Sequence, residues 1–325
     1  MSGMKKHKGV SVIVPYHNDT EDLIETLESL YDTMRIDPWE VIVVNDGGRN
    51  KLKMKKRNLI HIDNPVHLGV GRAFDIGVSA SKYDTLFLSG ADITHNDNDY
   101  APALYESVQQ HPTGLICTVC SSYRKPSQHH YGADILFKIT EDDLPPKSKL
   151  RGKPDGHRSI LEGKWRPKTG DGTYQIPSLM GAFYGVSKPW YDFIRGFNLH
   201  YQWGSLEPYI SLKSWLLGGE VLINTEIDVL HKTGREGFAR KDQMAYIYNR
   251  IMIALVVFGP YGIPFAEHLG QDRFVQRAGE QYQDWIEDIS YLRKHIEENA
   301  IYEPDELHRR MVSLSYFHTS REKTE

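Results

Sequence analysis

Residues Tyr83–Asp92 read YDTLFLSGAD. The apolar run TLFL leads into the small residues Ser89–Ala91, which predict a turn that ends on the carboxylate of Asp92. A short apolar run bounded by turn residues is typical of a parallel strand that is buried on both faces. Ligands of open α/β sheets bind beyond the carboxyl ends of such strands. Asp92 is therefore the first candidate for a functional site.

Similar short apolar runs recur over the first two thirds of the chain, separated by segments with helical spacing. Strands that alternate with helices in this way predict βαβ units and a mostly parallel sheet flanked by helices. The chain after about Arg240 has a helical pattern throughout, with no separate chemistry visible. The expected strands are Val10–Pro15, Trp39–Asp46, Leu59–Ile62, Gly114–Ser122, Ile176–Val186 and Val221–Leu230, and the expected helices include one from Gly69 to about Ser81 and one around Tyr209–Leu216.

The composition is that of a globular protein, since 40% of the 325 residues are hydrophobic and 11% are aromatic. The formal net charge of -4 excludes a globally basic nucleic-acid binder, but it leaves local basic patches possible. The longest apolar run, Ile251–Phe258, is too short for a membrane span and predicts a buried helix. Because no signal-peptide pattern is visible either, we expect a cytoplasmic protein, bacterial or, for a virus, in the host cytoplasm.

The cysteine content also favours a reducing compartment. Only Cys117 and Cys120 occur, so there is no disulfide framework. A C-x-x-C pair can indicate a redox site or half of a zinc site. Here the pair falls on an expected strand, where residues three apart point to opposite faces, and we favour a structural role.

Three further motifs have two interpretations each. Gly69–Gly77 resembles a dinucleotide-binding fingerprint, but it does not follow the first strand and is a weak signal. Asp97–Asp99 is a literal D-x-D, yet acidic residues before a helix commonly cap its amide groups, which is the interpretation we favour. Lys147–Lys168 carries eight Lys or Arg residues against two acidic ones, with Trp165 among them. It is either a solvated loop or a segment that orders over a polyanionic acceptor.

The order of these pieces resembles the GT-A glycosyltransferases of the family-two type. VSVIVPYHN, EVIVVNDGG and GVGRAFDIGVSASKYDTLFLSGADI resemble their nucleotide-sugar half. LMGAFYGVSK, WGSLEPYISLKSWLLGG and VLHKTGR resemble the acceptor half of the polypeptide N-acetylgalactosaminyltransferases. The resemblance covers about Val10–Arg235. It implies a GT-A catalytic domain over residues 1–240, with a nucleotide-sugar half at about 10–122 and an acceptor half at about 176–240, followed by a helical extension over 241–325.

The resemblance also implies roles for individual residues. Glu207 falls on the position of the general base of inverting members, and His231 on the third metal ligand. The family's D-x-D falls on Ser89–Asp92, so Asp92 and His231 would hold Mn²⁺ or Mg²⁺. The implied nucleotide-sugar-binding residues are Pro15, Tyr16, Asn18, Asp46, Arg72, Ser89, Gly90, Ala91 and Asp92, and the implied acceptor-binding residues are Gly181, Trp203 and Arg166.

The sequence departs from the family pattern at three places. Asn45 stands where Asp is common. Ser89 or Gly90 replaces the first Asp of D-x-D, and the segment Trp203–Glu207 keeps one acidic residue where the family has two. Two hypotheses therefore remain, an active nucleotide-sugar-dependent hexosyltransferase, with a UDP-sugar favoured, and a catalytically silent relative that binds a nucleotide or a glycan. Metal dependence stays open, and so does the acceptor, either a glycan or a hydroxymethylated DNA base.

Overall fold

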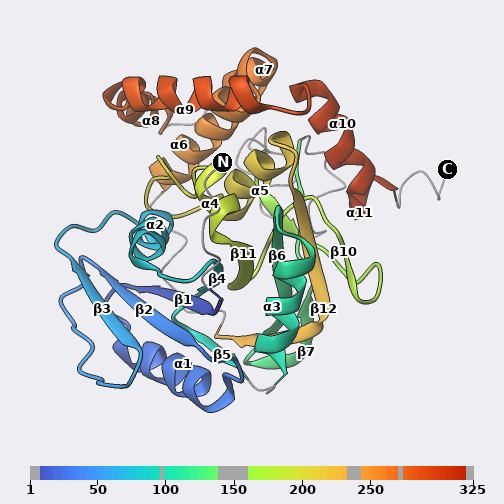
Figure 1. Ribbon diagram of the computed structural model, residues 1–325. Coiled ribbons are helices and arrows are strands. Elements are labelled where there is room, and N and C mark those ends of the chain that lie inside the picture. Colours follow the sequence, from blue (N-terminus) through green and yellow to red (C-terminus); the bar gives the residue numbers. More distant parts are fainter. Residues whose placement is uncertain (1–7, 96–98, 138–159, 233–242, 270–273, 320–325) are drawn as a thin grey trace, which may run out of the picture.

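The computed structural model describes residues 8–95, 99–137, 160–232, 243–269 and 274–319. Its centre is a ten-stranded sheet with helices on both faces, and further helices gather at the C-terminal end of the chain (Figure 1). This arrangement confirms the predicted α/β class with a helical C-terminal region.

The strand that contains the TLFL run, β4 (Thr85–Ser89), lies inside the sheet, and all of its residues are buried. It pairs in parallel with β1 (Val10–Tyr16) and antiparallel with β11 (Phe183–Ser187). From β1 the sheet continues in parallel to β2 (Trp39–Asp46) and then to β3 (Leu59–Asn64). The N-terminal part of the sheet thus has the parallel order that the sequence predicts.

On its other side, β11 pairs antiparallel with β6 (Gly114–Ser122), and β6 pairs in parallel with β12 (Glu220–His231). Because β11 runs against both of its neighbours, β6 and β12 point in the same direction as β4. The carboxyl ends of β1, β2, β4, β6 and β12 therefore lie along one edge of the sheet, together with the amino end of β11. The complete sheet is mixed, but this edge has the polarity that the sequence predicts.

Shorter strands extend the sheet or pair outside it. β5 (Ile93–His95) and β10 (Thr173–Gln175) are antiparallel to β12, and β7 (Lys125–His130) is antiparallel to β6. β8 (Ala133–Ile135) and β9 (Gly163–Trp165) form a separate two-stranded sheet.

One face of the large sheet is covered by α1 (Thr20–Thr33) and α3 (Tyr100–Gln110) (Figure 1). Their apolar side chains, such as Leu27 and Leu104, share a buried cluster with Phe87 of β4. The leucine spacing in α1 is therefore explained by burial of one helical stripe, as expected for a surface helix.

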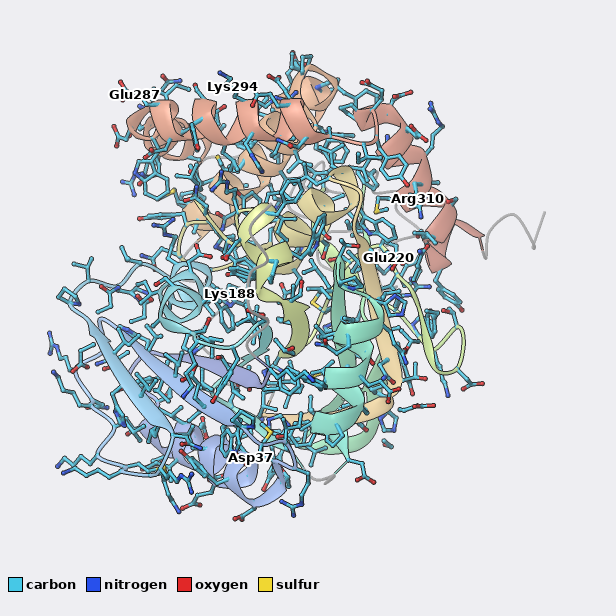
Figure 2. All side chains as sticks on the ribbon, in the orientation of Figure 1. Asp37, Lys188, Glu220, Glu287, Lys294 and Arg310 are labelled. Atoms are coloured by element: carbon cyan, nitrogen blue, oxygen red, sulfur yellow. The ribbon has the colours of Figure 1, made fainter. Side chains whose placement is uncertain are left out.

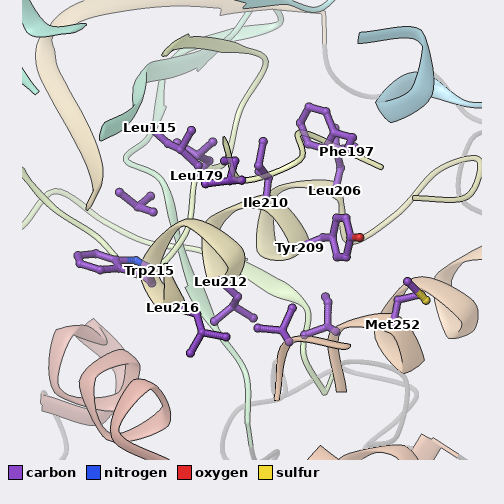
Figure 3. Packing of buried hydrophobic residues seen from close by; sticks show 14 of the residues in the cluster. Leu115, Leu179, Phe197, Leu206, Tyr209, Ile210, Leu212, Trp215, Leu216 and Met252 are labelled. Atoms are coloured by element: carbon purple, nitrogen blue, oxygen red, sulfur yellow. The ribbon is translucent and has the colours of Figure 1, made fainter. Parts of the chain in front are cut away.

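The other face is covered by α2 (Val70–Ala80), α4 (Lys188–Phe193) and α5 (Leu206–Leu216). Every residue of α5 is buried except Glu207. Figure 3 shows side chains of this helix, such as Tyr209, among apolar side chains of neighbouring elements. A helix that is apolar almost all round belongs in the core, and α5 links the sheet to the C-terminal helices.

The C-terminal helices begin with α6 and pack on α5. The apolar run Ile251–Phe258 is mostly buried, as predicted, and its residues Ile253–Val257 form a π-helix. Within the described residues, no helix is long and apolar enough to cross a membrane. The helices are α6 (Gln243–Met252), α7 (Ile263–Leu269), α8 (Val275–Asp284), α9 (Ile286–Asn299), α10 (Pro304–Leu314) and α11 (Tyr316–Thr319).

Most expected elements match the structure, and one does not. The segment Ile176–Val186 was expected to be one strand, but β11 begins only at Phe183. Pro177 cannot donate a backbone hydrogen bond, and Gly181 has a φ of +118°, so the backbone bends before the strand begins. The predicted domain boundary near residue 240 lies outside the described residues, and so do Asp97 and Asn98 of the D-x-D motif. The boundary and the capping role of that motif therefore stay predictions.

We expect Phe87→Ala to lower the free energy of unfolding by about 3–5 kcal/mol, because it removes a large buried side chain from the central strand. The Phe87 side chain is fully buried, with its ring 5.6 Å from that of Phe183. Urea denaturation measures the change. Val66→Ala is the control, since Val66 is 58% exposed and its loss is expected to change stability by at most about 0.5 kcal/mol. Equal effects of the two substitutions would show that β4 is not a central part of the core.

Candidate active site

Most of the predicted site residues lie along the one edge at which most strands end. Tyr16 ends β1, Asp46 ends β2 and His231 ends β12. Asp92 follows β4, and Gly181 precedes β11. The sheet polarity therefore brings residues from distant parts of the sequence to a single edge, as expected for α/β proteins that bind ligands there.

The ends of β1 and β2 are tied to each other by side chains predicted to bind the nucleotide. Asn18 has a φ of +67°, a conformation that asparagine tolerates better than most residues. Its Oδ1 accepts a hydrogen bond of 2.6 Å from the amide of Arg49, in the loop after β2. The hydroxyl of the buried Tyr16 accepts one of 3.1 Å from the amide of Leu52 in the same loop. Pro15 lies inside β1, next to Tyr16.

Asp46 organises the start of α2. Its carboxylate accepts hydrogen bonds of 2.8 and 2.7 Å from the amides of Leu68 and Gly69, and its Oδ2 lies 2.8 Å from Nδ1 of His67. Burial acts to raise the pKa of Asp46, but these hydrogen bonds together lower it below the usual value. The carboxylate is therefore ionised at neutral pH and holds the chain entering α2.

Arg72, in the first turn of α2, faces the acceptor half of the chain. Its Nη1 donates a hydrogen bond of 2.7 Å to Oδ1 of Asn198 and lies 3.9 Å from Asp75. The side chain is 37% exposed, so the guanidinium remains in contact with solvent. Arg72 thus connects the two halves at the same edge, in a place where a positive charge meets solvent.

The turn after β4 is held on both sides. The hydroxyl of Ser89 donates to the carbonyl of Gly90, and the carbonyl of Ala91 accepts a hydrogen bond of 2.8 Å from Thr26 of α1. A Cβ atom added to Gly90 would lie 3.0 Å from Oδ1 of Asp92. The turn therefore leaves the Asp92 carboxylate with room that a larger residue at position 90 would take.

Asp92 and His231 meet, as the resemblance implies. Oδ2 of Asp92 lies 3.1 Å from Nε2 of His231, and the backbone carbonyl of Asp92 accepts a hydrogen bond from the amide of Lys232. Burial alone would lower the pKa of His231, but the Asp92 carboxylate, together with the neighbouring Cys120, raises it to about 10. The imidazole is therefore protonated at neutral pH and forms an ion pair with Asp92.

Glu207 lies at the same edge, at the start of α5. The hydroxyl of Tyr184 donates a hydrogen bond of 2.9 Å to its Oε1, and lies 2.6 Å from the carbonyl of Gly181. Burial raises the pKa of Glu207 above its usual value, while the hydrogen bond from Tyr184 and the charge of His231 oppose the shift. The two contacts of Tyr184 place Glu207 beside Gly181, at the edge where the Asp92–His231 pair lies.

Cys120 of β6 lies between the two parts of this site. A Cβ atom added to Gly181 would lie 3.2 Å from Cβ of Cys120, which in turn acts on the pKa of His231. Cys117 is also buried, and both thiols are free. The two cysteines are therefore packed into the core and beside the site, and they form no disulfide.

The residues at this edge suit a divalent cation in part. The Asp92 oxygen and the His231 nitrogen are 3.1 Å apart, close to the separation of about 3 Å between neighbouring ligands of an octahedral cation. Among the residues that the structure describes, no group of three or more His, Cys, Asp or Glu side chains is arranged to hold a metal ion. The pair therefore fits a cation that takes its other ligands from a diphosphate and water, and the imidazole has to lose its proton first.

The predicted acceptor residues have different surroundings. Trp203 is 37% exposed and precedes α5, and its ring is 5.0 Å from that of Tyr246. Arg166, in contrast, is 5% exposed, and its Nη1 lies 3.5 Å from Oδ1 of the fully buried Asp134. This pairing anchors the region of β8 and β9, and acceptor binding by Arg166 stays a prediction. Residues 138–159, which include most of the basic segment, lie outside the described structure.

Sequence reasoning missed several residues of this edge. His17 and His67 have ring centroids 4.2 Å apart beside Asp46, and Tyr184 binds Glu207. His17 stands in the YHN motif after β1, which is a usable signal. His67 and Tyr184 carry no pattern of their own, because an isolated histidine in a loop and a tyrosine in a strand are both common.

Comparisons with known proteins agree with this fold. Residues 11–160 match the family model described as "Glycosyl transferase family 2". The chain is 24% identical over 239 residues to Polypeptide N-acetylgalactosaminyltransferase 8 of Drosophila melanogaster, a match that covers 67% of this chain and 37% of that protein. Among solved structures, the crystal structure of GalNAc-T7 with UDP, GalNAc and Mn²⁺ superimposes with a TM-score of 0.64 and 16% identity, covering 89% of this chain and 57% of that one.

The chain resembles the GT-A glycosyltransferases. The sequence-based resemblance is thereby confirmed, both for the nucleotide-sugar half and for the likeness to polypeptide N-acetylgalactosaminyltransferases. At this identity, the superposition shows a shared GT-A fold. The chain spans less than two thirds of the length of both glycosyltransferase relatives.

We expect Asp46→Ala to lower the free energy of unfolding at pH 7 by about 1–3 kcal/mol, because the amides of Leu68 and Gly69 lose their acceptor. The folded state lowers the pKa of Asp46 from its usual value of 3.8. The Asp46 carboxylate therefore stabilises the fold fully above pH 3.8, and this stabilisation is lost as the pH falls through the folded-state pKa. Denaturation at pH 7 and pH 3 should therefore show a smaller difference between variant and wild type in acid.

Asp63→Ala is the control for this prediction. The Asp63 carboxylate accepts hydrogen bonds from the side chains of Asn45 and Lys51. Its side chain is 52% exposed, so water can replace these contacts. A loss of stability as large in Asp63→Ala as in Asp46→Ala would contradict the role given to Asp46.

Proposed function

We propose that the protein transfers a sugar from a nucleotide sugar, with a UDP-sugar favoured, to a hydroxyl group of an acceptor. The observation that carries this proposal is that the Asp92–His231 pair and the Glu207 carboxylate lie at the same edge of a GT-A sheet. The similar structure with UDP, GalNAc and Mn²⁺ supports the choice of donor class.

In the proposed reaction, Glu207 is the general base. A hydroxyl group that attacks an anomeric carbon must lose its proton, and a positioned carboxylate can accept it. Tyr184 fixes the orientation of this carboxylate through its hydrogen bond to Oε1. Attack from the side of Glu207 displaces the nucleotide from the opposite side, and the configuration of the sugar is then inverted. Burial raises the pKa of Glu207, and the base must be deprotonated to act. As the pH is lowered, activity should therefore be lost at a higher pH than with an ordinary glutamate as base.

The departing nucleoside diphosphate needs positive charge nearby. Asp92 and His231 would hold Mn²⁺ or Mg²⁺, which would stabilise the negative charge that develops on the diphosphate. Arg72, whose guanidinium is partly open to solvent, is a second source of positive charge at this edge. Tyr16, Asn18, Asp46 and the turn after β4 would surround the nucleoside.

A catalytically silent relative that binds a nucleotide or a glycan is the second candidate. The feature that favours it is the turn after β4, where Ser89 and Ala91 supply no carboxylate. Such a protein would keep the nucleotide end of the edge but would have no need of a base held by Tyr184. Release of UDP from UDP-sugars, with water or an added sugar as acceptor, separates the two candidates.

We expect Glu207→Gln to reduce the rate of UDP release from its donor by about 10²–10⁴-fold, the usual contribution of a positioned base. A coupled assay of UDP across a panel of UDP-sugars measures this rate, and UDP binding should be unchanged. Glu220→Gln is a matched control, because this carboxylate is 35% exposed and lies at the far end of β12, near Arg310 (Figure 2). If Glu207→Gln turns over at nearly the wild-type rate, the base is another group.

We expect Asp92→Ala and His231→Ala each to weaken UDP binding in the presence of Mn²⁺ by about tenfold or more, because both are proposed ligands of one cation. Calorimetry with UDP, with and without Mn²⁺, measures the effect. Glu220→Ala and His111→Ala are the controls, since this pair has a similar separation of 3.0 Å but lies away from the edge. If EDTA changes neither UDP binding nor activity of the wild type, the diphosphate charge is neutralised by Arg72 or another fixed positive charge, and not by a cation.

A further inference from the structure

Helix α6 holds the loop that precedes Glu207. The Asn249 side chain accepts a hydrogen bond of 2.9 Å from the amide of Tyr201, and it donates bonds of 2.9 and 2.8 Å to the carbonyls of Tyr201 and Gly204. Asn249 is buried. The C-terminal helical region, in which the sequence shows no chemistry of its own, is therefore attached directly to the turn that starts α5.

Two aromatic rings meet at this attachment. Gly204 has a φ of +103°, and an added Cβ atom would lie 2.5 Å from the ring of Tyr246. The rings of Trp203 and Tyr246 are 5.0 Å apart and nearly perpendicular, with an angle of 85° between their planes. Both side chains are partly exposed. They form an aromatic corner between α6 and the loop before α5, in which Trp203 precedes Glu207 by four residues.

A pair of opposite charges lies beside this corner. The guanidinium of Arg250 is centred 5.5 Å from the Tyr246 ring, and its Nη2 is 3.9 Å from Oε2 of Glu162. The Arg250 side chain is 4% exposed and that of Glu162 is 34% exposed. Burial raises the pKa of Glu162 above its usual value, and the charge of Arg250 offsets part of this shift, so the arginine partly compensates a carboxylate that still reaches solvent.

The start of β9 brings Glu162 towards the first turn of α5. A Cβ atom added to Gly163 would lie 2.7 Å from Cε of Met180 and 3.5 Å from Cγ of Pro208, the residue after Glu207. Tyr246 also lies close enough to both carboxylates, Glu162 and Glu207, for each of them to raise its pKa. The aromatic corner, the charged pair and the proposed base therefore belong to one region of the surface.

We propose that Trp203, Tyr246, Glu162 and Arg250 form a subsite for a sugar ring of the acceptor, next to Glu207. This inference rests on the proposed function and assigns the acceptor to the saccharides. The C-terminal helices then contribute to the active site through α6, and Glu162 supplies the second acidic residue near the base that the segment Trp203–Glu207 lacks.

The geometry favours a sugar over a nucleic-acid base. A flat base stacks best on an open aromatic face or between parallel faces, whereas Trp203 and Tyr246 stand at a right angle. A pyranose ring is thicker, and it can bury one apolar face against an aromatic ring while its hydroxyl groups point sideways. A carboxylate such as Glu162 accepts hydrogen bonds from hydroxyl groups but repels the phosphates of a nucleic acid.

Glu162→Gln and Tyr246→Ala test the subsite. The full chain, with UDP and Mn²⁺, is applied to an array of immobilised oligosaccharides that end in hexoses and N-acetylhexosamines. We expect the wild type to bind members of this set. We expect both variants to bind them about 10- to 100-fold more weakly, the effect of losing one hydrogen bond to a charged group or one aromatic contact. UDP binding should stay within about twofold of the wild type.

Glu162→Gln keeps the shape of the side chain, so it remains informative if Tyr246→Ala disturbs α6, which thermal unfolding detects. Glu220→Gln is the control, because its side chain is 35% exposed, against 34% for Glu162. The same array carries single-stranded and duplex oligodeoxynucleotides. Three results would overturn the subsite: wild type that binds no saccharide, wild type that binds the oligodeoxynucleotides in their place, or unchanged saccharide binding by Glu162→Gln.

The two proposals fail in different ways. Release of UDP from UDP-sugars without saccharide binding overturns the subsite and leaves the proposed transferase activity in place. Saccharide binding that depends on Glu162, without any release of UDP, supports the subsite and favours the silent, glycan-binding relative.

Discussion

The antiparallel pairing of β4 with β11 is the constraint on which the candidate site depends. Ser89 lies opposite Phe183 in this pair, so the turn that leads to Asp92 is adjacent to the segment that enters β11. Had β11 run parallel to β4, Gly181 would lie at the other edge of the sheet, far from Asp92. One reversed strand therefore brings the two halves of the chain to a common edge, and the carboxylates of Asp92 and Glu207 to one site.

Much of the fold could be predicted because the core elements have simple patterns. The bounds of β2 and β6 were predicted to the residue, since each is a short apolar run between polar or turn residues. The pairing of Asp92 with His231 required the resemblance, because the two residues are 139 positions apart in the chain. No local sequence pattern connects the turn after β4 with the end of β12, which comes much later in the chain.

Other residues of the candidate site could not be predicted from the sequence, because their roles depend on tertiary contacts. Tyr246 and Asn249 belong to an amphipathic helix, and their spacing indicates only which face is buried. Their contacts with the loop before α5 depend on how the C-terminal helices pack against α5 (Figure 1). Arg166 shows another limit, because the resemblance implied acceptor binding for this residue but not that its side chain would be 5% exposed and paired with the buried Asp134.

The burial of α5 has a consequence for how such a protein could acquire new specificity. Ten of its eleven residues are enclosed, so a substitution at nearly any position creates a cavity or a clash, and the helix has little scope to shift or rotate. The exception is Glu207, the proposed base. Substitutions that change which ligand the protein binds would therefore have to arise in the elements that face α5. Those elements can change while Glu207 keeps its position in the first turn of the helix.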